Sequence, residues 1–255
     1  MILNGKTMVV SGVANEKSIA WGIVRSLHSQ GANLIFTYHK DKSLRKLKRL
    51  LNENDIEPLC IVPCDVMNDE SIKEAFLKIK EATGKIDGLV HSIAYADIDA
   101  LNCNYVDVSR EQFITALNIS VYSLVALCKH AKSILADGGS VVTQTYIGSQ
   151  RVIRNYSVMG VAKAALEASV RYLAADMGEI GVRVNAISSG PIRTSSAVAI
   201  KGLEEELNHI RDNAPLKKNV SQEEIADATM FLLSHISRGI TGETIYVDSG
   251  YHILG

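Results

Sequence analysis

The segment of residues 155–163, NYSVMGVAK, holds two side chains that can donate or stabilise a proton. Tyr156 carries a phenol and Lys163 carries an ammonium group. They are seven residues apart, so on a helix they share one face, about 10 Å apart along its axis. There the lysine charge would favour an anion that develops near the phenol. Taken alone, such a pair is more often an aromatic anchor and a solvated amine. The surrounding elements must therefore show whether the pair has a catalytic role.

Those elements alternate between short apolar runs and amphipathic segments. Continuous apolar strands separated by helices are typical of a parallel sheet with helices on both faces. Right-handed crossovers then give an α/β, Rossmann-like doubly wound sheet of about seven strands, with ligands at the strand carboxyl ends. Asn155 is the expected N-cap of the helix that carries Tyr156 and Lys163. Strands are predicted over 6–13, 33–38, 59–63, 86–92, 139–146, 182–187 and 243–248, and helices over 18–30, 41–53, 69–83, 109–135, 155–178 and 221–234.

The length of 255 residues predicts a single domain over residues 1–255. The longest irregular stretch is residues 188–215, which contains one weak helical pattern over 197–210. An insert of this kind near the strand ends is a candidate substrate lid.

Composition excludes several kinds of partner. The 27 basic and 28 acidic residues nearly balance, which argues against nucleic acid and acidic membrane surfaces. We see no secretion signal and no run of 18 apolar residues, so we expect a cytoplasmic protein that does not span a membrane. The four cysteines form no C-x-x-C pair and are expected to be reduced and buried. No ligand cluster suggests a metal.

The turn after the first strand is a candidate dinucleotide site. Gly12 ends that strand, and a helix begins near Ser18 and Ile19. A glycine there allows close approach of a pyrophosphate, which the free helix N–H groups can bind. Because the G-x-G-x-x-G spacing is absent, a glycine that serves only a tight turn is an equal alternative.

The end of the second strand bears on cofactor choice. NAD-preferring folds usually carry an acid there, whereas Asp41 falls late, inside the next helix. His39, Lys40 and Ser43 can bind a 2′-phosphate by charge and hydrogen bonds. NADPH is therefore favoured over NADH, with a solvated basic helix start as the alternative. Further cofactor contacts are expected at the ends of the third and fourth strands, from Asp65, Val66, Ser92, Ile93 and Ala94.

The catalytic segment resembles one particular family. Ordinary short-chain reductases carry Tyr-x-x-x-Lys with a serine thirteen residues before the tyrosine, but here Met159 and Tyr146 occupy those positions. The Tyr-x6-Lys spacing, with a second tyrosine ten residues earlier, is that of FabI-type enoyl-acyl-carrier-protein reductases of the short-chain dehydrogenase/reductase superfamily. The resemblance extends along the chain, through GVANEKSIAWGI, CDV, HSIA, RVNAISSGPIRT and TGETIYVDSG.

The resemblance implies reduction of the trans-2 double bond of enoyl thioesters on acyl carrier protein, in fatty acid synthesis, by an enzyme that is commonly a homotetramer. It makes Tyr156 the donor to the enolate oxygen, Lys163 the ligand of the nicotinamide ribose, and Tyr146 a second catalytic tyrosine. Further cofactor contacts are expected from Gly190, Pro191, Ile192 and Thr194, and substrate contacts from Ala96, Tyr146, Tyr156, Ile200 and Leu203.

Several substrate-side residues depart from the family pattern, namely Val121, Ser189, Ser195, Ala199 and Leu203. These departures leave the acyl length open. They also keep two alternatives: a carbonyl or alcohol short-chain dehydrogenase, and a divergent NADP(H)-binding paralogue without turnover.

Overall fold

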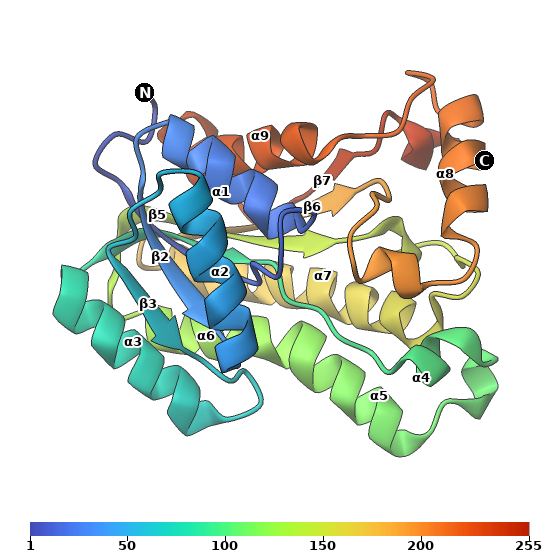
Figure 1. Cartoon of the computed structure of the whole chain (residues 1–255), viewed down its shortest axis with the longest axis horizontal. Coiled ribbons are helices and arrows are strands. Elements are labelled where there is room, and N and C mark those ends of the chain that lie inside the picture. The colour runs from blue at the N-terminus through green and yellow to red at the C-terminus, as the bar shows by residue number, and fades with distance from the viewer. Residues whose placement is uncertain (255) are drawn as a thin grey trace.

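The computed structural model of the chain describes residues 1–254, with the side chain of Ala199 outside that description. Seven parallel strands form one sheet in the order β3-β2-β1-β4-β5-β6-β7, with helices on both faces (Figure 1). The predicted fold is confirmed. The strands are β1 (Thr7–Ser11), β2 (Asn33–Tyr38), β3 (Cys60–Pro63), β4 (Ile86–His91), β5 (Leu135–Thr145), β6 (Arg183–Ser189) and β7 (Thr244–Val247).

The strands are buried because helices cover both faces of the sheet. Every residue of β1 and β6 is buried, as expected for a central parallel strand. One core cluster unites sheet residues with α1, α2 and α9, and the other unites them with α3, α6 and α7. The helices are α1 (Ile19–Ser29), α2 (Asp41–Glu53), α3 (Asp69–Thr83), α4 (Ile98–Asn102), α5 (Arg110–Leu117), α6 (Ser123–Ala131), α7 (Ser157–Gly178), α8 (Leu203–Asn213) and α9 (Gln222–Leu233).

The predicted helix over 109–135 is wrong in two respects. A π-helical turn over Asn118–Tyr122 separates α5 from α6, and the next strand already begins at Leu135. Ile134 and Leu135 are buried and apolar, so they resemble one more helical turn, but they pair with Ile86 of β4. Tertiary pairing overrides local periodicity at this point.

The predicted start of the helix that carries Lys163 is also wrong. Tyr156 is the N-cap of α7, and Asn155 lies outside the helix with a φ of 58°. The Asn155 side-chain amide donates instead to the carbonyl of Lys201, at 2.8 Å. Its side chain therefore ties the irregular stretch to α7 rather than capping the helix.

The irregular stretch contains less helix at its start than its pattern indicates. A 3₁₀ turn over Ala197–Ala199 is followed by Gly202 with a φ of 84°, and α8 begins only at Leu203. In Figure 1, α8 stands apart from the sheet, close to the C-terminus. The prediction of one weak helix over 197–210 is therefore corrected to a short turn followed by a separate helix.

Among the described residues, one helical run, Arg110–Ala131, is long and apolar enough to cross a membrane by length and composition. In the fold it has the contacts of a core helix, since α6 packs against α3 and α7. Only 44% of the most apolar 18 residues of this run are buried, so part of its apolar surface remains exposed.

Candidate active site

A cavity of about 420 Å³ opens at the carboxyl ends of β1, β4, β5 and β6. This is where a doubly wound sheet binds ligands, because the helices on either side of β1 and β4 diverge there. The cavity is lined by all three predicted catalytic residues, Tyr146, Tyr156 and Lys163. It also collects Gly12, Ser18, Ile19, Ser92, Ile93, Ala94, Gly190, Pro191, Ile192 and Thr194, together with Ala96, Ile200 and Leu203.

The turn after β1 has the geometry of an anion cradle. Gly12 has a φ of 100°, and a Cβ there would lie 2.0 Å from the carbonyl oxygen of Ser92. Only glycine fits this close approach between two strand ends. Ser18 then caps α1 by accepting from the N–H of Trp21, which leaves the earlier N–H groups of that turn available for an anion.

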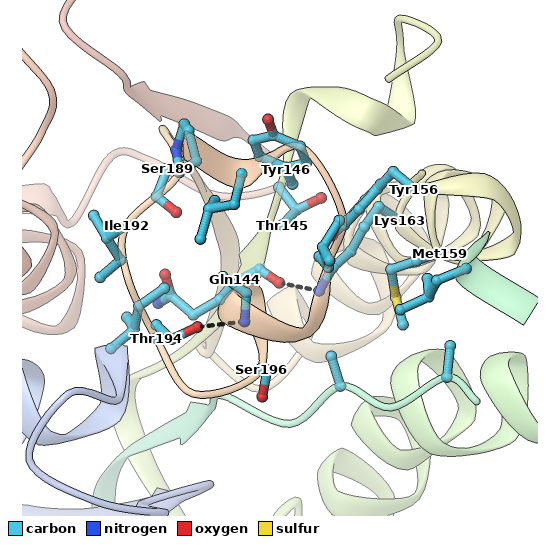
Figure 2. Close-up of a pocket in the computed structure, with 18 of the residues that line it drawn as sticks. Gln144, Thr145, Tyr146, Tyr156, Met159, Lys163, Ser189, Ile192, Thr194 and Ser196 are labelled. Carbon is cyan, nitrogen blue, oxygen red and sulfur yellow. Dashed lines mark hydrogen bonds between the residues drawn. The ribbon is translucent and has the colours of Figure 1, made fainter. Parts of the chain in front are cut away.

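Lys163 points from α7 into the same cavity. Its Nζ donates to the backbone carbonyl of Gln144 at 2.8 Å, the contact drawn as a dashed line in Figure 2. An ammonium group has three donors, so further donors remain for a ligand in the cavity. Burial lowers the pKa of Lys163 to about 8, although the nearby Glu167 carboxylate opposes this change.

Two tyrosine rings that line the cavity pack against each other. The rings of Tyr146 and Tyr156 pack edge to face with centroids 4.9 Å apart. Burial raises the pKa of both phenols, and the Glu206 carboxylate adds to the effect. Both hydroxyls therefore remain protonated at neutral pH and are able to donate hydrogen bonds.

The sequence prediction missed Glu206, which reaches the cavity from α8 and accepts a hydrogen bond from the Tyr146 hydroxyl. Burial raises the pKa of its carboxyl, while Tyr146 and His209 work in the opposite direction. Three glutamates in a row at a helix start look like a solvated turn that interacts with the helix dipole. No local signal distinguishes the third from the other two.

Five predicted cofactor residues lie outside the cavity: His39, Lys40, Ser43, Asp65 and Val66. They follow β2 and β3, on the far side of β1 from the tyrosine pair. The Nε2 of His39 lies 3.5 Å from Oδ2 of Asp65, and Lys40 is the exposed N-cap of α2. A ligand that spans both groups must extend across the end of β1.

A family model for enoyl-(acyl carrier protein) reductase matches residues 12–252. The chain belongs to this family. An NADH-named FabI of Bacillus cereus is 51% identical over 254 residues, covering 100% of this chain and 99% of that protein. An NADPH-named FabI of Staphylococcus aureus is 45% identical over 252 residues, covering 99% and 98%.

Solved structures of the family agree in fold. The Bacillus cereus enzyme, crystallised with NADP⁺ and an indole naphthyridinone, has a TM-score of 0.97 at 51% identity and covers 100% of this chain and 99% of its own. The Aquifex aeolicus enzyme has a TM-score of 0.95 at 42% identity, with the same coverage. The prediction of an enoyl reductase, and so of an oxidoreductase of fatty acid synthesis, is confirmed at the level of the family.

The reductase keeps an apolar wall beside the tyrosine pair. Met159, where an ordinary short-chain reductase has its tyrosine, is buried and lines the cavity. The family assignment argues against a carbonyl or alcohol dehydrogenase, and so does this thioether, because position 159 has no phenol where such an enzyme carries its tyrosine. Of the other apolar residues in the wall, sequence analysis did not single out Ile98, Leu101 and Ile153.

Proposed function

We propose that this reductase uses a nicotinamide cofactor to reduce the trans-2 double bond of enoyl thioesters carried on acyl carrier protein. The single observation that carries the proposal is the shared cavity. It brings the anion cradle of Gly12 and Ser18, the buried ammonium of Lys163 and the hydroxyl-bearing ring of Tyr156 to one place. The names of the relatives support the same reaction.

The described residues fit such a cofactor. The missing Cβ at Gly12 lets the end of β1 lie directly against the Ser92 carbonyl at the end of β4, and the first turn of α1 offers N–H donors to a pyrophosphate. Gly190 also lies in the cavity wall, where a Cβ would meet Val220 at 2.7 Å. The bound cofactor supplies the hydride for the β-carbon of the substrate.

The side chains would then stabilise the charge that hydride addition leaves on the thioester oxygen, until a proton reaches the α-carbon and gives the saturated acyl thioester. Tyr156 is protonated and donates a hydrogen bond to that enolate oxygen, as in an oxyanion hole. Lys163 binds the ribose hydroxyls and holds a positive charge on the same side of the cavity. Tyr146 packs against Tyr156 and limits the freedom of its ring.

The stretch of residues 188–215 is proposed to act as a lid on one single domain. Ile200 and Leu203 line the cavity from this stretch, and Leu203 is buried. An alkyl chain can bury its surface against these side chains, and their closure excludes water from the reacting atoms.

The decisive experiment follows cofactor oxidation with crotonyl and acetoacetyl thioesters side by side. Crotonyl thioester should be reduced and acetoacetyl thioester should not. Tyr156→Phe should lower kcat about 100-fold, the effect of one lost oxyanion donor, while cofactor affinity changes little. Tyr105→Phe, an exposed tyrosine outside the cavity wall, serves as the control. Tight cofactor binding without oxidation by any enoyl thioester would show a paralogue without turnover.

We further propose that NADPH is preferred over NADH. Lys40 and His39 place basic groups at the end of β2, and Asp41 is already the first residue of α2. Lys40→Met should lower the ratio of kcat/KM for NADPH to that for NADH about fivefold, as expected for about 1 kcal/mol from one exposed cation. Lys42→Met, an exposed neighbour, is the control. An unchanged ratio in the Lys40 variant would refute this assignment.

A homotetramer in the cytoplasm completes the proposal. The partly exposed apolar run Arg110–Ala131 and the neighbouring α7 expose Ile114, Tyr122 and Tyr172, which a second copy of the chain can cover. Light scattering on the purified chain tests the oligomeric state.

The cysteines support the proposed compartment. Burial raises the pKa of Cys64 to about 11 and of Cys128 to about 12, so both are unreactive thiols that suit a reducing compartment.

A further inference from the structure

One carboxyl group of the lid helix α8 lies in direct contact with the tyrosine pair. Glu206 is half-buried in the cavity wall and accepts a hydrogen bond from the hydroxyl of Tyr146. Its neighbours Glu204 and Glu205 are exposed, and Glu204 is engaged by Arg193 at 2.8 Å. The third glutamate of the run is therefore in a different environment from the first two.

Tyr146 lies between this carboxyl group and Tyr156. Its ring contacts Tyr156 edge to face, and its hydroxyl donates to Glu206 of α8 (Figure 2 shows both tyrosines among the residues that line the cavity). A rotation of Tyr146 that breaks the bond to Glu206 also changes its packing on Tyr156. Tyr146 thus forms one connection between the lid and the phenol that faces the substrate.

A second contact joins the lid to the other side of Tyr156. The side-chain amide of Asn155 donates to the carbonyl of Lys201 at 2.8 Å. The residue before Tyr156 and the ring that packs on Tyr156 are therefore both hydrogen-bonded to the same short stretch, residues 201–206. Opening of that stretch releases both restraints together.

We propose that Glu206 is a positioning residue, which orients Tyr146 against Tyr156 when α8 closes over the substrate. The inference rests on the proposed reductase function and adds a coupling between lid closure and the geometry of the tyrosine pair. Substrate binds with the lid open, and the Tyr146–Glu206 bond completes the site as the lid closes. The loss of this bond should therefore appear in kcat rather than in KM.

The first set of variants compares Glu206→Leu, Glu206→Gln and Glu205→Leu with the wild type, using NADPH and crotonyl thioester. Glu206→Leu removes the acceptor and should lower kcat about tenfold with KM nearly unchanged. Glu206→Gln keeps an acceptor oxygen and should recover most of that loss. Glu205→Leu makes the same change one residue away on the exposed side and should stay within about twofold of the wild type.

A double-mutant cycle separates positioning from mere support of the lid. Tyr146→Phe removes the hydroxyl, so Glu206→Leu on that background should change the residual kcat, measured at high enzyme concentration, by less than about twofold. A full tenfold effect on that background would overturn the inference, as would equal activity of Glu206→Leu and Glu205→Leu. A wild type that oxidises no cofactor with any enoyl thioester would instead refute the proposed function.

Discussion

Replacing Lys163 by methionine should stabilise the cofactor-free protein at neutral pH while weakening its hold on the cofactor. Lys163 is only 6% exposed, and its Nζ has a carbonyl acceptor at 2.8 Å. Burial lowers its pKa from the ordinary 10.5 to about 8. The proposed function accounts for a lysine at this position, since its charge would serve a bound cofactor at a cost to stability.

The magnitude follows from the two pKa values. The gap between 10.5 and about 8 corresponds to about 3 kcal/mol of destabilisation, present in full below pH 8. Methionine leaves the Gln144 carbonyl without this donor, which costs about 1 kcal/mol. The net gain is about 2 kcal/mol, so the melting temperature should rise by about 4–8 °C at pH 7.

The pH dependence gives the sign of the effect independently. Between pH 8 and 10.5 the unfolded chain keeps a proton on Lys163 that the folded chain has lost, so wild-type stability should rise with pH relative to the variant. His91, which lies close by, does not interfere, because burial lowers its pKa to about 3 and the ring stays neutral throughout.

Thermal unfolding of both proteins without cofactor, at several pH values, measures this difference. Titration with NADPH measures the cost to binding, which should be at least tenfold if Lys163 holds the ribose. A variant that melts below the wild type at pH 7, or whose melting temperature relative to the wild type does not fall between pH 8 and 10.5, would refute the reasoning.

Two further predictions concern the surroundings of the site. Among the described residues the buried side-chain oxygen of Gln144 has no partner, while its Nε2 donates one long hydrogen bond to Thr229 at 3.3 Å. Gln144→Leu should therefore stabilise the protein by about 1 kcal/mol, and a lower denaturant midpoint would contradict this. A Cβ at Gly148 would lie 2.7 Å from the ring of Tyr156, so Gly148→Ala should lower kcat about tenfold with little change in melting temperature. Wild-type kcat in that variant would show that the ring position is unimportant.

The sheet was predictable because its signal is repeated at every strand. Runs such as TMVVS and NLIFTY are apolar, short and followed by amphipathic helices, so order and direction follow from general rules of connection. Gly12, Ser18, Tyr156 and Lys163 were predictable for a related reason. Gly12 follows a strand, Ser18 and Tyr156 precede helices, and Lys163 lies two turns into the helix that Tyr156 precedes, so the alternation places each of them to within a residue or two.

Features that depend on contacts between distant segments were not predictable. Glu206 reaches Tyr146 only because α8 folds back over the strand ends, 60 residues further along the chain. Leu135 belongs to β5 only because Ile86 pairs with it. Neither partner is visible in a local window, so periodicity assigned both residues to ordinary helix surfaces or interiors.

The misplaced start of α7 has a consequence for the chemistry. Asn155 and Ser157, on either side of Tyr156, have φ values of 58° and 22°, which non-glycine residues rarely adopt. A regular helix from Asn155 would place Tyr156 and Lys163 on one helical face, as their spacing suggests. The observed entry instead turns Tyr156 at the cap, independently of the helix, while the Asn155 side chain is bound by Lys201. Because such backbone strain persists only where its surroundings hold it, the lid that supplies this contact also maintains the direction of the phenol.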